Sequence, residues 1–466
     1  MPELPARHVV VVGGGVSGLA AALALRRDGP PELRITVLEA SAALGGKLRT
    51  SDFVGVPVDE GAESFLARRP EAVELARALG MGDELVAPAT SAASVWTRGR
   101  LRPLPAGTLL GVPTGVASVS RSRVLSAGGS ARLLLDLALP GRPAPGDVTV
   151  GGYVGRRVGR EVVDRLVDPL LGGVYAGRAD LLSLAATIPA LAPVAARGGS
   201  LLRGARAARP APLGGPVFQT LPGGLGRLVD AVATASGADL RLGATVRRLD
   251  REPGCRWVVT LGPTAAPERL AADAVILAVP APPAARLVAD VAPAAATDLA
   301  AIDYASVAIV TLAYAGAAAL PGSGFLVPAV DGRLTKAVTF ATAKWAHLAA
   351  VSPGLVILRC SVGRYGDPAD LQRDDRDLVA GVAAELAKAV GLTARPVESR
   401  VTRWGGALPQ YAVGHLARVA RIRSALAAAP GLAVCGAAYD GVGVPACIAS
   451  GSRAAAEILQ ASQWAP

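Results

Sequence analysis

Residues 8–39, HVVVVGGGVSGLAAALALRRDGPPELRITVLE, contain a short apolar run, a glycine turn, an alanine- and leucine-rich stretch and a second apolar run. We expect a buried strand over 8–12, a helix over 16–27 that ends at Asp28-Gly29-Pro30, and a second strand over 34–38. This order is a βαβ unit, in which the two strands run parallel. The stretch therefore predicts an α/β fold built on a parallel sheet.

The turn after the first strand has the pattern Gly-x-Gly-x-x-Gly at Gly13, Gly15 and Gly18. Glycines in this position allow a tight turn, close approach of a pyrophosphate and close helix–strand packing, and the helix start presents free N–H groups to the phosphates. Glu39 follows at the end of the second strand, where a carboxylate accepts hydrogen bonds from ribose hydroxyls. The unit thus predicts a dinucleotide site, with contacts at Gly13, Gly14, Gly15, Val16, Ser17, Gly18, Glu39 and Ala40.

Other segments of the same character lie far along the chain. An apolar run at 274–279 enters a proline turn, and another at 432–435 precedes a glycine-rich loop and a closing helix over about 448–459. We expect these pieces to complete one Rossmann-like domain assembled from discontinuous segments. The β-rich stretches 306–314 and 355–362 predict a second, mixed sheet, and residues 86–209 predict helices and loops.

The amino-acid composition limits the kinds of partner that the protein is expected to bind. The net charge of +11 calls for an anionic partner, but aromatic residues are only 4% of the chain, so we expect no nucleic acid. Anionic lipid and an acidic small molecule both remain open. The four cysteines form no Cys-x-x-Cys pair and there are three histidines, so we expect free thiols and no metal site.

The membrane question follows from a mean hydropathy of +0.41. The longest apolar run, 305–320, is shorter than the ~20 residues that span a bilayer. The first residues lack a charged segment followed by an apolar one. We expect a cytoplasmic protein whose contact with the cell membrane, if it has one, is peripheral and on the inner face.

Further glycine motifs indicate which dinucleotide the site binds. Leu44-Gly45-Gly46-Lys47-Leu48-Arg49 and Glu60-Gly61-Ala62-Glu63-Ser64 resemble the extended FAD signature of the amine-oxidase-like flavoproteins, with Lys47 where that family usually has arginine. The glycine loop 441–444 before the last helix suits the flavin ring edge, where reduction places negative charge. No second Gly-x-Gly-x-x-Gly follows a strand, which favours an oxidase over a reductase.

Three longer segments carry a more specific resemblance. ESFLARRP at 63–70, DPLLGGVYAG at 168–177 and WGGALPQYAVG at 404–414 resemble the oxygen-dependent porphyrinogen oxidases of haem biosynthesis, in particular the Gram-positive type. The resemblance implies a coproporphyrinogen III or protoporphyrinogen oxidase with non-covalent FAD. It also implies hydride transfer from a methylene bridge to the flavin N5 in three rounds, with O2 as acceptor and hydrogen peroxide as product. Haem-intermediate transfer to a ferrochelatase-type partner is a further expectation.

The resemblance also implies domains and site residues. We expect an FAD domain at 1–66, 222–284 and 404–466, a substrate domain at 67–87, 197–221 and 285–403, and a helical, membrane-associated lobe at 88–196. No side chain is expected to be an obligatory acid or base. The expected further cofactor contacts are Lys47, Gly61, Ala62, Glu63, Ser64, Val246, Trp404, Val442, Gly443 and Val444, and the expected substrate contacts are Arg69, Leu170 and Val174.

Four alternatives remain open. Protoporphyrinogen IX is the alternative substrate. A flavin amine oxidase would carry a lysine on the central strand, which 305–310 lacks, and an aromatic cage, of which Tyr439 alone makes half. A carotenoid desaturase would need a long apolar tunnel. A flavin-binding partner of a chelatase would bind without oxidising.

Overall fold

A five-stranded parallel sheet unites segments from both ends and the middle of the chain. Its order is β11 (Asp239–Arg241), β2 (Arg34–Leu38), β1 (His8–Val12), β15 (Ala274–Leu277) and β21 (Leu432–Val434). The computed structural model describes residues 7–209, 214–252, 256–316, 318 and 320–460. The discontinuous assembly expected from the sequence is confirmed, because β1 pairs in parallel with both β2 and β15.

Both faces of this sheet are buried, as the near-continuous valine run of β1 requires. Val10 and Val12 belong to one apolar cluster, and Val9 and Val11 belong to another. Helices α1 (Val16–Asp28) and α18 (Val444–Gln460) cover the second face, and they pack so closely that a Cβ on Gly451 would clash with the Ser17 carbonyl oxygen. The expected start of the last helix at 448 is wrong by one turn, because Pro445 is accommodated in the first turn of α18.

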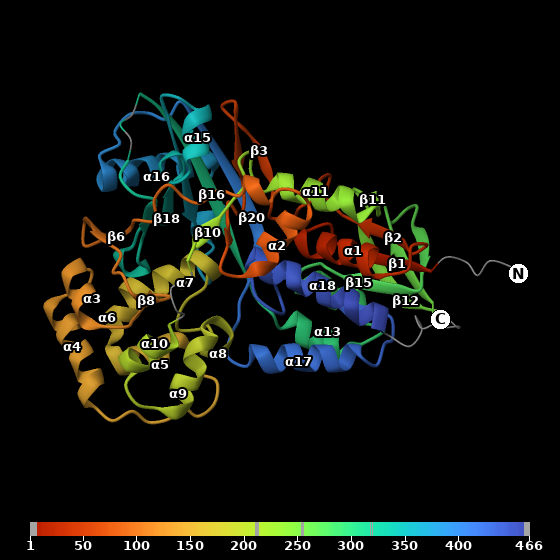
Figure 1. Cartoon of the computed structure of the whole chain (residues 1–466), viewed down its shortest axis with the longest axis horizontal. Helices are drawn as coiled ribbons and strands as arrows, with labels where there is room; N and C mark the ends of the chain where they lie inside the picture. Colours follow the sequence, from red (N-terminus) through yellow and green to blue (C-terminus); the bar gives the residue numbers. More distant parts are fainter. Residues whose placement is uncertain (1–6, 210–213, 253–255, 317, 319, 461–466) are drawn as a thin grey trace, which may run out of the picture.

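A seven-stranded mixed sheet forms the second large sheet of the structure (Figure 1). All its pairs are antiparallel except β17 with β6. The mixed sheet expected from 306–314 and 355–362 is therefore confirmed. Its order is β20 (Glu398–Pro409), β16 (Tyr304–Ala315), β19 (Leu355–Val362), β18 (Thr335–Phe340), β17 (Gly324–Leu326), β6 (Ala93–Thr97) and β7 (Arg100–Pro103), with α16 (Asp375–Val390) packed on one face.

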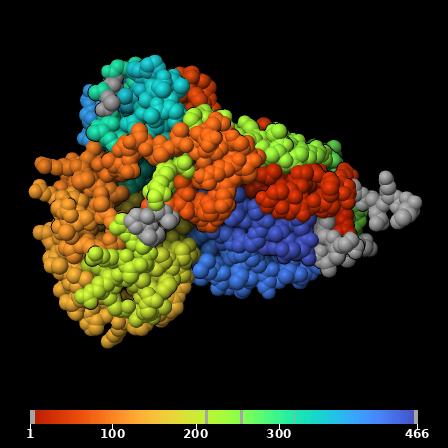
Figure 2. All heavy atoms as spheres, viewed as in Figure 1, coloured from red at the N-terminus to blue at the C-terminus, as the bar shows by residue number. Residues whose placement is uncertain are grey.

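Helices from the orange and yellow part of the chain form a separate lobe at the lower left of Figure 1, and Figure 2 shows this lobe set off from the rest of the surface. Its core gathers apolar residues of α4 (Ala127–Ala138), α5 (Val150–Val158), α7 (Asp168–Tyr175) and α10 (Leu201–Ala208). The β-hairpin β6–β7 departs from the helices and loops expected over 86–209, because it pairs with β17 of the mixed sheet.

The remaining elements connect these parts. Among the described residues, no helix is both long and apolar enough to cross a bilayer. Cys360, Cys435 and Cys447 are buried and unpaired, as expected, whereas Cys255 lies outside the described residues. The other strands are β3 (Thr50–Phe53), β4 (Val56–Asp59), β5 (Phe65–Leu66), β8 (Thr108–Leu109), β9 (Val112–Pro113), β10 (Phe218–Gln219), β12 (Val246–Arg251), β13 (Trp257–Leu261) and β14 (Glu268–Ala272), and the other α-helices are α2 (Pro70–Ala78), α3 (Val116–Ser122), α6 (Arg160–Val162), α8 (Leu184–Thr187), α9 (Ala192–Arg197), α11 (Gly226–Ser236), α12 (Ala281–Val288), α13 (Pro293–Ala300), α14 (Ala341–Lys344), α15 (Ala346–Val351) and α17 (His415–Leu426).

Candidate cofactor site

The first two glycine motifs meet at the start of α1. The amide of Gly45 donates to the carbonyl of Gly14 at 2.8 Å, so the segment 44–49 lies along the turn 13–18. A Cβ on Gly18 would lie 2.0 Å from the Gly13 carbonyl oxygen, whereas a Cβ on Gly15 would meet no atom within 4 Å. Gly18 is therefore required for packing, and Gly15 borders open space at a helix N-terminus. That hollow fits a pyrophosphate.

Glu39 lies at the edge of the same hollow. Its carboxylate accepts hydrogen bonds from the Gly14 amide at 2.7 Å and the Ser41 amide at 2.8 Å, and it is only partly buried. The Ala244 amide donates to the Glu39 carbonyl at 2.8 Å, which brings the start of β12, with Val246, beside Glu39 and Ala40. These residues converge where a ribose and its base would lie.

Lys47 lines the hollow from the second motif. Its side chain is open to solvent, and among the described residues no hydrogen bond or ion pair reaches its ammonium group. Desolvation by the surrounding protein nevertheless lowers its pKa. A side chain that is exposed to solvent and also closely surrounded by protein atoms lies in a concave surface. Its charge is available to a phosphate there.

The loop before α18 approaches from the opposite side. Asp440 accepts from Arg423 at 2.7 Å, from Arg453 at 2.5 Å and from the Ser450 hydroxyl at 2.9 Å. The Gly441 amide donates to the Tyr411 hydroxyl at 2.8 Å. These bonds fix the expected flavin loop, in which Gly443 is exposed, Val442 is half-buried and Val444 is buried.

Cys447 connects the two sides of the site. Burial raises the pKa of its thiol, and a hydrogen bond with Ser17 and the charges of Lys47 and Arg69 oppose that shift. Ser17 therefore lies beside Cys447, and α2, which begins directly after Arg69, packs on α18. The structure thus brings together expected cofactor and substrate residues that lie far apart in the sequence.

Residues 60–64 pass close to the backbone of Lys47. A Cβ on Gly61 would lie 2.0 Å from the Lys47 carbonyl oxygen, and the Trp404 indole N–H donates to the Glu60 carbonyl at 3.0 Å. Arg49, which the sequence analysis did not include among the contacts, lies over the Trp404 ring at 5.6 Å and donates to the Glu60 carboxylate at 2.7 Å. Its signal in the sequence is the second basic residue after the glycine pair.

Glu63 joins this loop to the mixed sheet. Its carboxylate pairs with Lys344 at 2.6 Å and with Arg359, and the guanidinium of Arg359 also donates to the Gly61 carbonyl at 2.5 Å. Burial alone would raise the pKa of Glu63, but the charges of Lys344 and Arg359 outweigh it and hold the pKa at about 2. The ion pairs of Glu63 therefore fix the position of the loop that contains Gly61, Ala62 and Ser64.

The expected substrate residues differ in setting. Arg69 is exposed at the N-cap of α2 and pairs with Glu71 at 2.6 Å. Val174 is 41% exposed although the neighbouring Tyr175 is buried in the helical lobe, and Leu170 lies one turn earlier on the same face of α7. An exposed valine on a core helix fits an apolar wall of a cleft.

The features expected of an amine oxidase are missing. Strand β16 contains no lysine. Tyr439 is 2% exposed and packs inside an apolar cluster, and its hydroxyl has no partner among the described residues. It therefore cannot form part of an aromatic cage around a substrate.

Replacing Glu63 with glutamine should lower the free energy of unfolding by about 3 kcal/mol at neutral pH, because it leaves two cations unpaired. The contribution of a carboxylate with a depressed folded-state pKa is complete above its ordinary value near 4.5 and disappears as the pH falls through about 2. Denaturant titration from pH 7 to pH 3 measures this. Glu84→Gln removes an exposed pair with Arg227 and should cost less than about 1 kcal/mol.

Replacing Gly15 with leucine should abolish FAD retention while leaving the apoprotein folded, because the new side chain enters open space. Glu39→Ala should weaken FAD binding by about 1–3 kcal/mol. Flavin absorbance after gel filtration and thermal melts of the apoprotein measure both effects. Gly115→Leu is the control, since a Cβ there also meets no atom within 4 Å but lies at the start of α3. Full flavin retention by Gly15→Leu would contradict this placement.

Comparisons with known proteins identify the family of the chain. The family model for flavin containing amine oxidoreductases matches residues 16–459. The chain is 39% identical to the coproporphyrinogen III oxidase of Mycobacterium bovis, over 98% of both chains, and 34% identical to that of Bacillus subtilis, over 97% of this chain and 98% of the relative.

A crystal structure from Exiguobacterium sp. 255-15, of a protein provisionally assigned as a protoporphyrinogen oxidase, superposes with a TM-score of 0.86 at 33% identity, covering 98% of this chain and 99% of the other. The chain therefore belongs to the flavin containing amine oxidoreductase family, together with these coproporphyrinogen III oxidases.

Proposed function

We propose that this protein oxidises coproporphyrinogen III to coproporphyrin III with O2 as acceptor. The observation that carries the proposal is the 39% identity, over 98% of both chains, to a relative named for that activity. Bound FAD supplies the redox chemistry, because its N5 accepts a hydride and O2 then takes the electrons to give hydrogen peroxide. Removing six hydrogens from the macrocycle consumes three O2.

The protein's own residues bind and orient. Gly13 to Gly18 and Lys47 would hold the pyrophosphate, Glu39 the ribose, and Val442 to Val444 with Trp404 the ring system. Leu170 and Val174 would supply an apolar wall for the macrocycle, and Arg69 a cation for a propionate. No acid or base is required of the protein, because tautomerisation can follow hydride loss without one.

Charge favours coproporphyrinogen over protoporphyrinogen IX, which is the second candidate because the Exiguobacterium relative carries the protoporphyrinogen name. Coproporphyrinogen has four propionates, and protoporphyrinogen has two propionates and two vinyl groups. Arg69 is exposed, and in the part of the chain that the structure describes its one ion pair is with Glu71. Arg203 and Arg206 fall within 197–221, the range expected for the substrate domain, but they lie on α10 in the helical lobe and so do not strengthen this argument.

We propose the three expected regions as functional units, with two adjustments. Helix α10, within 197–221, packs into the core of the helical lobe. Strands β6 and β7, within 88–196, join the mixed sheet. If the regions are defined by packing, α10 belongs to the helical lobe, and β6 and β7 belong to the region of the mixed sheet.

Peripheral membrane contact is part of the proposal, and α4 supports it. Leu134 and Leu135 are exposed there, as is Leu139 at the C-cap of the helix, whereas Leu133 is buried. The exposed arginines Arg121, Arg123, Arg142 and Arg156 lie on the same lobe. Apolar side chains flanked by cations suit the interface of an anionic bilayer. A ferrochelatase-type partner stays a prediction.

Oxygen uptake by the purified FAD-loaded protein tests the activity and separates an oxidase from a flavin-binding partner. We expect a higher kcat/KM for coproporphyrinogen III than for protoporphyrinogen IX, with the difference shrinking at high salt. Arg69→Ala should raise KM for coproporphyrinogen about ten-fold, since a charge-assisted bond is worth about 1.5–3 kcal/mol before solvent screening.

Arg68→Ala tests the neighbouring position, and Arg203→Ala is the matched control on α10. Equal efficiency on the two substrates, together with an unchanged KM in Arg69→Ala, would remove the charge argument. Absence of oxygen uptake with either porphyrinogen would remove the proposed activity itself.

Vesicle sedimentation tests the membrane contact. Binding to vesicles rich in phosphatidylglycerol should be lost at high salt, and the double change Leu134→Ser and Leu135→Ser should weaken it about ten-fold or more. Leu416→Ser, at an exposed leucine of α17, is the control. Equal binding by all three proteins would show that α4 does not contact the bilayer.

A further inference from the structure

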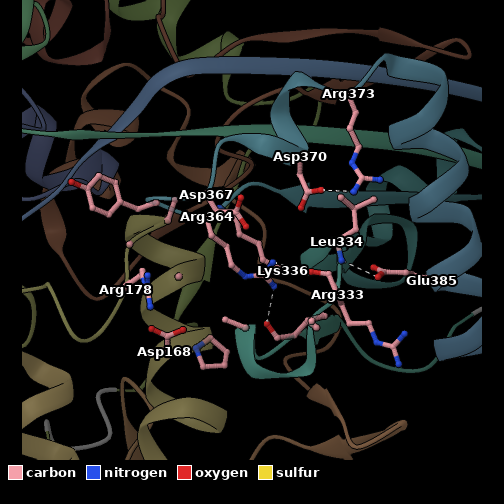
Figure 3. Close-up of a pocket in the computed structure, with 18 residues that line it drawn as sticks. Asp168, Arg178, Arg333, Leu334, Lys336, Arg364, Asp367, Asp370, Arg373 and Glu385 are labelled. Atoms are coloured by element: carbon pink, nitrogen blue, oxygen red, sulfur yellow. Dashed lines mark hydrogen bonds and ion pairs between the residues drawn. The ribbon is translucent and has the colours of Figure 1, made fainter.

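A cavity of about 500 Å³ lies against the face of α7 that carries Pro169, Gly172 and Ala176 (Figure 3). Leu170 and Val174 lie on a different face of the same helix. The rest of the wall comes from the segment leading into β18, the loop after β19 and one residue of α16. The cavity therefore shares a helix with the proposed substrate cleft but does not belong to it.

An apolar wall separates the two. Ala176, Ala305, Val307 and Ala407 form a small cluster, with Trp404 packed against it from the cofactor side. Tyr365, which lines the cavity, packs against the same cluster and donates its amide to the Ala176 carbonyl at 3.0 Å. The cavity and the cofactor site are thus neighbours with side chains between them.

The cavity is lined by five cations, Arg178, Arg333, Lys336, Arg364 and Arg373. Of these five, Arg373 alone has a carboxylate partner within the described part of the chain, Asp370 at 2.9 Å. The guanidinium of Arg364 donates to the carbonyls of Arg333 at 2.9 Å and Thr335 at 3.1 Å, which fix its position without cancelling its charge. In Figure 3, Arg178, Lys336 and Arg364 lie around one space, whereas Arg333 turns away from it, with its guanidinium 4.5 Å from the centre of the Trp96 ring.

Three of the four carboxylates of the wall have hydrogen-bond or ion-pair partners. Glu385 accepts the amides of Leu334 and Thr335, each at 2.9 Å, and Asp168 accepts the amide of Ala179 at 2.8 Å. Asp370 has its arginine. The wall thus carries five cations against four carboxylates, Asp168, Asp367, Asp370 and Glu385, and its formal charge is positive by one unit.

Lys336 is the most constrained of the cations. It is 7% exposed, and no hydrogen bond or ion pair reaches its ammonium group from the described residues. Burial, with the nearby charge of Arg364, lowers its pKa to about 7. A buried ammonium group without a partner is costly unless an anion accompanies it.

We propose that this cavity binds a small polycarboxylate. Guanidinium forks match carboxylates in a bidentate geometry, and cations spread over several walls suit a ligand whose carboxylates are separated rather than one compact anion. The volume lies within the range of small-ligand sites. The carboxylates can come from a free di- or tricarboxylic acid or from the propionates of a porphyrin. This site is additional to the proposed oxidation and does not depend on it.

Isothermal titration of the FAD-loaded protein with citrate tests the proposal, and coproporphyrin III is titrated as a second probe. Lys336→Met should weaken the affinity for the bound probe about ten-fold or more, and Arg178→Met several-fold, since each loses a charge-assisted partner. Arg203→Met, an exposed arginine outside the cavity, should leave the affinity unchanged. Arg178 is exposed and unpartnered among the described residues, so its variant tests the site even if Lys336→Met fails to fold.

The two probes separate the sources. Citrate binding that depends on Lys336 and Arg178 assigns a free polycarboxylate, and the same dependence with coproporphyrin III alone assigns porphyrin propionates. Binding of neither probe, or binding equally strong in wild type and both variants, overturns the proposal. A protein that binds citrate here but consumes no oxygen with porphyrinogens would lose only the proposed oxidation.

Discussion

The position of β1 between β2 and β15 is the constraint on which the rest of the structure depends. Because these strands pair in parallel, their carboxyl ends lie at one edge of the sheet, and the turn after β1 opens into the crevice at that edge. The glycines there reconcile two requirements. Gly13 and Gly18 let α1 pack closely, and Gly15 leaves space at the helix start.

Segments remote in sequence are then fixed around that crevice by specific polar contacts. Asp440 ties the last glycine loop to two arginines, and Glu63 ties residues 61–64 to two cations of the mixed-sheet region. Trp404 holds the same loop through the Glu60 carbonyl. The site is therefore built from the parallel sheet, the mixed-sheet region and the last glycine loop. A change in one of these contacts would shift expected cofactor residues that take no part in the contact.

The sequence was sufficient for the central βαβ unit, because valine runs, the glycine pattern and a capped helix agree there on one structure. It was insufficient for β11, whose Asp-Leu-Arg has no strand pattern and forms only because β2 offers a free edge. The hairpin β6–β7 likewise exists through pairing with β17. Arg49 and the buried position of Tyr439 depend on side-chain contacts between distant segments, which no local pattern encodes.

The central claim is that this flavoprotein fold removes six hydrogens from a tetracarboxylate porphyrinogen. The direct measurement is the stoichiometry of a single-batch oxidation under air, followed by porphyrin absorbance, oxygen uptake and peroxide release together. The account predicts three O2 consumed and three hydrogen peroxides released per coproporphyrin III formed, with no reaction above the non-enzymatic rate when FAD is absent. Porphyrin formation that is equally fast without protein-bound FAD, or oxygen uptake that yields no porphyrin, would contradict it.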